Sequence, residues 1–154
     1  MPQAPARERI DGAIAALQRL AELFLERRRQ LAGEAGLTEA EWRLLEEIAA
    51  ERFMPSLFAK RRGRERSPAA VSRVLRGLLD AELVRVEVGS EDARQRVYRL
   101  TARGRERLAA LRERREGAIA AIWKGFPARE LAEFERFSNA LSDALERYAR
   151  ERSG

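Results

Sequence analysis

The spacing of hydrophobic residues along the chain predicts a mostly helical protein. Near the N-terminus, apolar side chains recur at intervals of three and four residues, which indicates an amphipathic helix running to about Ala32. Gly33 and Gly36 follow and predict the end of that helix. A second stripe predicts a helix over residues 39–52. The two stripes contain Ile10, Ile14, Leu17, Ala21 and Phe24, then Trp42, Leu45, Ile48 and Ala49.

Local signals predict where the next helices begin. Thr38 and Glu41 have the spacing of a capping box at the start of the second helix. Ser67 followed by Pro68 is typical of an N-cap and the first residue of a helix, which is expected to run to about Ala81. A short third helix is expected over residues 56–62.

The helix after Ser67 has two contrasting faces, and a hairpin is expected to follow it. Residues 83–88 and 96–100 alternate apolar and charged side chains as two strands do, with a turn between them. The helix is apolar at Val71, Val74, Leu75 and Leu78, and it carries Ala69, Ser72, Arg73 and Arg76 on the opposite face.

Two amphipathic helices are predicted to complete the chain. Thr101 is expected to cap a charged helix over residues 102–124, and a last helix follows Pro127. The middle of the chain is too small to cover all the terminal apolar stripes, which favours burial against a second chain. The last stripe contains Leu131, Phe134, Leu141, Leu145 and Tyr148.

The excess positive charge is confined to the middle of the chain. Between Lys60 and Arg107 there are 14 basic and 7 acidic residues, and the rest of the chain has a net charge of −1. A basic segment of this kind is the expected electrostatic footprint of a nucleic-acid-binding module. A run before Ser67 either clamps a phosphate at the helix N-terminus or forms a solvated basic turn. The run consists of Lys60, Arg61, Arg62, Arg64 and Arg66.

The order of the predicted elements indicates a winged helix-turn-helix, mainly α with a small β-hairpin wing. In that fold Ser67 and Pro68 would lie closest to the DNA bases, and Ala69 could contact a thymine methyl group. Ser72 could bind base edges or phosphate, and Arg73 has the fork that suits guanine.

Two further arginines have open interpretations. Arg76 either contacts DNA or belongs to a solvated helix face, and Arg96 either reaches phosphate or flanks the hairpin tip.

Three segments, "LTEAEWRLLEEIA", "SPAAVSRVLRGLLDAELVR" and "EDARQRVYRLTARGRERL", resemble the MarR (multiple antibiotic resistance regulator) family of bacterial transcription factors. The resemblance covers residues 37–108. It implies a homodimer with a winged helix-turn-helix in each subunit, dimerisation through N- and C-terminal helices, and a pocket that often binds a small molecule. "FAKRRGRERS", residues 58–67, is longer and more basic than the family's connection before the recognition helix.

The resemblance also assigns residues at the wing. The family's Asp-x-Arg motif falls on Asp92 and Arg94, which implies that Arg94 enters the minor groove while Asp92 holds it. Phe24, Trp42 and Leu45 are candidates for an effector pocket that would take a small aromatic or phenolic ligand. Aromatic residues on apolar stripes, Trp123 and Phe126 included, are more often ordinary core.

These inferences predict one domain over residues 1–154 with three parts. Residues 6–36 would form an N-terminal dimerisation helix, residues 37–101 the DNA-binding lobe, and residues 102–154 the C-terminal dimerisation helices. The predicted function is sequence-specific binding of a pseudo-palindromic operator in double-stranded DNA, as a dimeric repressor released by a small molecule.

Composition argues against several other functions. The chain has no cysteine and no histidine, so thiol and imidazole chemistry and the usual zinc ligands are missing, and neither an enzyme, a metal site nor a cofactor is expected. Without a signal-like N-terminus or a membrane-length apolar run, a cytoplasmic protein is expected. A helical scaffold with non-specific nucleic-acid affinity and an RNA-binding protein remain alternatives. The basic segment has no aromatic stacking platform for RNA.

Overall fold

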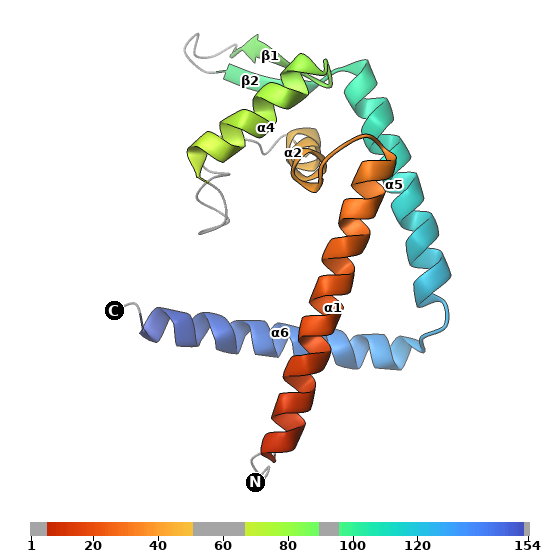
Figure 1. Ribbon diagram of the computed structural model, residues 1–154, viewed down its shortest axis with the longest axis vertical. Coiled ribbons are helices and arrows are strands. Elements are labelled where there is room, and N and C mark those ends of the chain that lie inside the picture. Colours follow the sequence, from red (N-terminus) through yellow and green to blue (C-terminus); the bar gives the residue numbers. More distant parts are fainter. Residues whose placement is uncertain (1–5, 51–66, 90–95, 153–154) are drawn as a thin grey trace. The chain divides into compact units, whose positions relative to one another are not determined.

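The computed structural model describes residues 6–50, 67–89 and 96–152. Its elements are α1 (Arg7–Glu34), α2 (Glu39–Ala49), α4 (Pro68–Asp80), β1 (Val84–Val88), β2 (Arg96–Leu100), α5 (Ala102–Trp123) and α6 (Ala128–Glu151) (Figure 1). The mainly helical fold with one antiparallel hairpin is confirmed. The predicted helix over 56–62 and the basic run before Ser67 lie outside the described residues.

The chain divides into two compact units, Met1–Arg114 and Arg115–Gly154, and α5 runs from the first into the second. The first unit holds the hydrophobic core. Each helix and strand that the structure describes in this unit contributes to the core, and α2 contributes most. The buried residues include Leu31 and Ala32 of α1, Trp42, Leu44, Leu45 and Ile48 of α2, Val71, Leu75 and Leu78 of α4, Val84 and Leu100 of the hairpin, and Leu108 and Leu111 of α5.

The predicted caps are confirmed with one correction. The Thr38 hydroxyl accepts a hydrogen bond from the Glu41 N–H at 3.1 Å, while the Glu41 carboxylate accepts one from the Thr38 N–H at 2.7 Å. Gly33 lies inside α1 and does not end it. The chain leaves the helix at Gly36, whose φ of 68° is accessible to glycine without strain.

The hairpin is joined to α5 by Thr101. Its N–H donates to the Leu83 carbonyl at 3.1 Å, and its hydroxyl donates to the Glu82 carbonyl at 2.6 Å. The same hydroxyl accepts from the Gly104 N–H at 3.0 Å, so it caps α5 as predicted. Glu82 has a φ of 57°, a left-handed conformation that carries a cost for a residue with a side chain.

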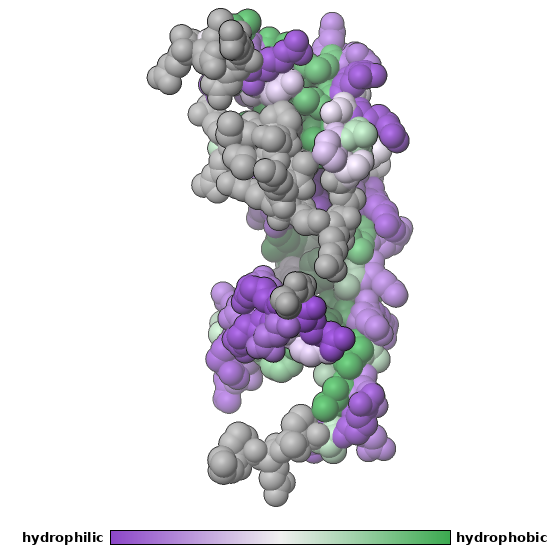
Figure 2. All heavy atoms as spheres, turned by 90° about the vertical axis from the view of Figure 1, so that its left-hand side faces the viewer, coloured by the Kyte–Doolittle hydropathy of each residue, from purple (hydrophilic) through white to green (hydrophobic). Residues whose placement is uncertain are grey.

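The second unit consists of the end of α5 and α6, and α6 has no buried residue within it. The first half of α1 is similarly open. In the space-filling view, apolar side chains lie on the surface among charged ones (Figure 2). The exposed large apolar residues of these helices include Ile10, Ile14, Leu17, Leu23 and Phe24 of α1 and Phe134, Phe137, Leu145 and Tyr148 of α6. No helix in the described ranges is long and apolar enough to cross a membrane.

Gly104 allows α5 to begin directly against the hairpin, because a Cβ at this position would overlap the Leu83 carbonyl oxygen. Gly104→Ala should therefore lower the free energy of unfolding by about 1–3 kcal/mol. Gly33→Ala is the matched control, since a Cβ there meets nothing within 4 Å and alanine favours helix by up to about 1 kcal/mol. Urea denaturation measures both. Equal stabilities for the two variants would contradict the close approach.

Candidate nucleic-acid interface

The N-terminal turn of α4 is open to solvent and held by its own cap. The Ser67 hydroxyl accepts a hydrogen bond from the Ala70 N–H at 3.2 Å, and Pro68 occupies the first helical position. Ser67, Pro68 and Ala69 are all exposed. Proline has the φ that the first turn needs and lacks the N–H that would be left without a partner there. This turn is therefore capped and accessible to a partner.

The two faces of α4 are separated as the sequence predicts. Val71, Leu75 and Leu78 are buried in the core, whereas Ser72, Arg73 and Arg76 are exposed. Among the ion pairs between described residues, none involves Arg73 or Arg76. The buried face of α4 packs against α2 and β1. The exposed face thus carries two arginines and a hydroxyl on a helix whose other face is fixed.

The wing is described only at its base. Val88 pairs with Arg96 at the end of the hairpin nearest the tip, and Arg96 is exposed. The other residues predicted for the interface lie outside the described residues, and their roles stay predictions. They are Arg64 and Arg66 before α4, and Arg94 with Asp92 at the wing.

A charged cluster joins α1 to the start of α2. The Glu39 carboxylate lies 3.2 Å from Arg28 and 2.5 Å from Arg43, and the Arg28 guanidinium lies 4.7 Å from the centre of the Trp42 ring. Burial acts to raise the pKa of Glu39, but the hydrogen bonds and charges of Arg43 and Arg28 outweigh it and lower that pKa. Glu39 therefore stays ionised to a lower pH than an isolated glutamate.

The three residues predicted for an effector pocket differ in their surroundings. Trp42 and Leu45 are core residues with exposed fractions of 2% and 0%, whereas Phe24 is 47% exposed. Two cavities lined by described residues border none of the three. The effector site at Phe24, Trp42 and Leu45 stays a prediction.

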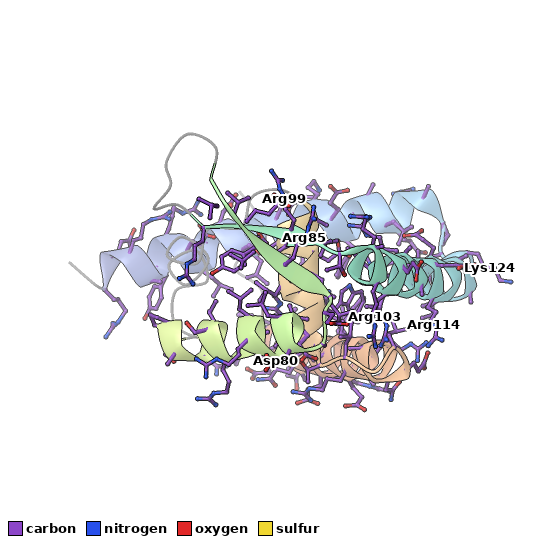
Figure 3. The ribbon with its side chains drawn as sticks, turned by 90° about the horizontal axis from the view of Figure 1, so that it is seen from above. Asp80, Arg85, Arg99, Arg103, Arg114 and Lys124 are labelled. Carbon is purple, nitrogen blue, oxygen red and sulfur yellow. The ribbon has the colours of Figure 1, made fainter. Side chains whose placement is uncertain are left out.

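Sequence reasoning did not single out four arginines that the structure brings together at the base of the wing. Arg85 and Arg99 are directly opposed across the hairpin, and Arg105 and Arg112 lie on the first half of α5. Figure 3 labels Arg85 and Arg99 side by side on the hairpin. The seven-residue spacing of Arg105 and Arg112 could have shown that both lie on the same face of one helix. The pairing of Arg85 with Arg99 depends on the strand register, which the sequence does not reveal.

The fold resembles that of known transcription regulators. No protein-family model matches the chain, and no curated protein matches it by sequence. The crystal structure of the MarR family transcription regulator SP03579 aligns over 94% of this chain and 95% of that one, with a TM-score of 0.82 and 21% identity. The S. aureus MepR-DNA complex aligns over 84% of this chain and 94% of that one, with a TM-score of 0.69 and 16% identity.

A third structure has a bound small molecule. It is the Mycobacterium tuberculosis MarR family protein Rv2887 in complex with p-aminosalicylic acid, which aligns over 83% of this chain and 96% of that one, with a TM-score of 0.62 and 23% identity. The chain has the mainly helical, winged-helix fold of MarR family transcription regulators.

Proposed function

We propose that this protein is a cytoplasmic transcription regulator that binds an operator in double-stranded DNA as a homodimer and represses transcription. The observation that carries the proposal is the exposed face of α4, with Ser72, Arg73 and Arg76 next to a hairpin. The fold it shares with the DNA-bound MepR supports the same conclusion. A helix with one buried face and one polar, basic face is suited to the major groove.

In this proposal the N-terminal turn of α4 lies nearest the bases. Arg73 forms two hydrogen bonds with a guanine, and Ser72 contacts a base edge or phosphate. Arg94 extends from the wing into the minor groove, with Asp92 fixing its direction because an arginine side chain is costly to order. Arg64, Arg66 and Arg96 neutralise phosphates.

Dimerisation accounts for the apolar surfaces of α1 and α6. Phe134, Phe137, Leu145 and Tyr148 are each about half or more exposed, and they recur at intervals that place them along one stripe of α6. A second copy of the chain would bury this stripe and the one on α1. Two copies would also present two α4 helices to successive major grooves, roughly 34 Å apart.

Release from DNA would come from a small aromatic or phenolic ligand. The complex of Rv2887 with p-aminosalicylic acid supports this class of effector. A ligand can shift the protein toward a non-binding geometry only by the difference in its affinity for the two states. The predicted site for it is Phe24, Trp42 and Leu45.

Footprinting on the DNA upstream of the protein's own gene, over a series of salt concentrations, tests sequence-specific binding. We expect protection of a two-fold symmetric site. The logarithm of the binding constant should fall linearly with the logarithm of the salt concentration, with a slope of about −0.9 for each phosphate neutralised. Equal affinity for any duplex would refute the proposal and favour a scaffold with non-specific nucleic-acid affinity.

Arg73→Ala should weaken operator binding by about 1–3 kcal/mol and relax the preference at one base pair, because a bidentate contact to a base is lost. Arg115→Ala is the matched control, an exposed arginine of α5 outside the helix and hairpin proposed to bind DNA. Fluorescence anisotropy with operator and point-mutated operators measures both. An Arg73→Ala variant that binds like Arg115→Ala would contradict the role of Arg73.

Phe137→Glu should convert the dimer to a monomer, because it places a charge in the apolar stripe of α6. Arg136→Glu is the control, since it changes charge on a different face of the same helix. Light scattering after size-exclusion chromatography gives the mass of each. A Phe137→Glu variant that stays dimeric would show that α6 does not form the interface.

A further inference from the structure

The turn between α4 and β1 has a charged residue in a position where glycine is usual. After the C-cap of α4, the Glu82 N–H donates to the Leu79 carbonyl at 3.0 Å. The Leu83 N–H donates to the Leu78 carbonyl, also at 3.0 Å. These two bonds define a Schellman motif, in which the residue after the C-cap is left-handed and is usually glycine. Glu82 occupies that position with a φ of 57°.

The end of α1 has the same motif with glycine in the left-handed position. The Gly36 N–H donates to the Gly33 carbonyl, and the Leu37 N–H donates to the Ala32 carbonyl, each at 2.9 Å. Gly36 adopts its φ of 68° without strain, because it has no Cβ. Glu82 adopts a similar conformation at a cost, since its Cβ crowds the following carbonyl oxygen. Residues strained in this way persist where their surroundings hold them, and they cluster at functional sites.

Thr101 makes the contacts that hold Glu82 in this conformation. Its hydroxyl donates to the Glu82 carbonyl at 2.6 Å, and its N–H donates to the Leu83 carbonyl at 3.1 Å. The same hydroxyl accepts from the Gly104 N–H at 3.0 Å, and a Cβ on Gly104 would overlap the Leu83 carbonyl oxygen. One side chain therefore joins the end of α4, the base of the hairpin and the start of α5.

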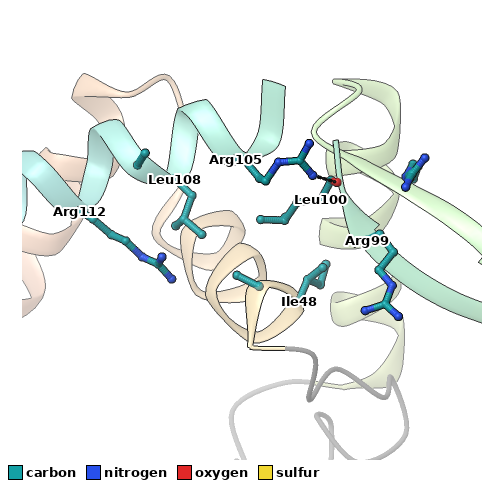
Figure 4. Close-up of a pocket in the computed structure, with 9 residues that line it drawn as sticks. Ile48, Arg99, Leu100, Arg105, Leu108 and Arg112 are labelled. Atoms are coloured by element: carbon teal, nitrogen blue, oxygen red, sulfur yellow. Dashed lines mark hydrogen bonds between the residues drawn. The ribbon is translucent and has the colours of Figure 1, made fainter. Parts of the chain in front are cut away.

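The base of the hairpin is held on its second strand as well. Figure 4 shows the cavity beside the wing, where the Arg105 guanidinium of α5 donates to the Leu100 carbonyl at 3.0 Å. Leu100 pairs with Val84 across the hairpin, and both side chains are buried in the core. Both strands are therefore fixed where they leave the core.

The end of the hairpin nearest the tip is more exposed than the base. Within β1 only Val84 is buried, and Val88 is 71% exposed. Arg96, which pairs with Val88, is exposed too. The position of this end relative to α4 therefore follows from how the base is held.

We propose that Thr101 is a positioning residue for DNA binding. By holding Glu82 in its left-handed conformation, the Thr101 hydroxyl directs the hairpin so that the wing reaches the minor groove while α4 lies in the adjacent major groove. A glycine in place of Glu82 would avoid the cost but would permit other directions for the hairpin. This role rests on the function proposed above.

The first experiment contains no DNA. The chain has no cysteine, so Ala69→Cys on α4 and Val88→Cys on β1 place one spin label on each element, and both positions are exposed. Labelled protein is mixed with an excess of unlabelled protein, so that the measured distance lies within one chain. Double electron-electron resonance should give a narrow distance distribution for the parent and for Thr101→Ser. Thr101→Val should give one about twice as wide or more, because both hydrogen bonds of the hydroxyl are lost.

Thr38→Val is the matched control. It removes a hydroxyl that caps α2 by accepting from the Glu41 N–H at 3.1 Å, and it lies at the start of α2 rather than at the hairpin. Thermal unfolding measures the stability of each variant. Both substitutions are also compared in a Glu82→Gly background, where relief of the left-handed strain offsets the lost cap. In either background Thr101→Val should broaden the distribution, and Thr38→Val should not.

The second experiment separates the two grooves of the operator at saturating protein. Dimethyl sulfate reports contact at guanine N7 in the major groove, and hydroxyl radicals report protection of the flanking minor grooves. Thr101→Val should keep the major-groove protection and lose the minor-groove protection, with a Kd raised about tenfold or more. Thr38→Val should keep both, because a loss of stability alone affects the two grooves together.

Two results would overturn the positioning role. One is a distance distribution for Thr101→Val that is as narrow as that of Thr38→Val. The other is an equal loss of protection in both grooves by Thr101→Val. A parent chain that protects no operator refutes the proposed DNA binding and the positioning role with it, whereas the distance measurement still decides whether Thr101 holds the hairpin.

Discussion

The structure of the first unit depends on the burial of α2, an eleven-residue helix against which α1, α4 and β2 all pack. Trp42, Leu44, Leu45 and Ile48 are each 2% exposed or less, so this short helix is apolar on more than one face. Short helices are marginal in isolation, and tertiary packing supplies most of their stability. The orientation of α4, and with it the proposed DNA-binding face, is therefore set by the same contacts that make α2 a helix.

Charged side chains at the edges of α2 complete these contacts. Glu39 binds Arg28 of α1, and Glu46 binds Arg112 of α5 at the cavity beside the wing. Arg107 of α5 donates to the Ala35 carbonyl after α1. Exposed ion pairs contribute little stability alone. A carboxylate that binds side chains from two helices also sets the orientation of those side chains.

Much of the fold could be predicted from local sequence because local chemistry decides it. The Thr38 and Glu41 capping box, the Ser67 and Pro68 start of α4 and the Thr101 cap of α5 each involve residues three or fewer positions apart, and all are as expected. The end of α1 was misplaced, because either Gly33 or Gly36 could have ended it and only Gly36 adopts the left-handed conformation. The opposition of Arg85 and Arg99 was missed, because strand register depends on the turn between the strands and on the packing of the other face.

The sequence by itself determined the order of the elements, their caps and which face of each helix is apolar, because these depend on propensities and spacings within a few residues. It also located the surplus of positive charge in the middle of the chain. Only the tertiary structure decided which arginines meet. Arg85, Arg99, Arg105 and Arg112 come together because the hairpin folds back on itself and α5 begins directly against it at Gly104. Such contacts depend on packing between segments distant in the sequence, and no local pattern encodes them.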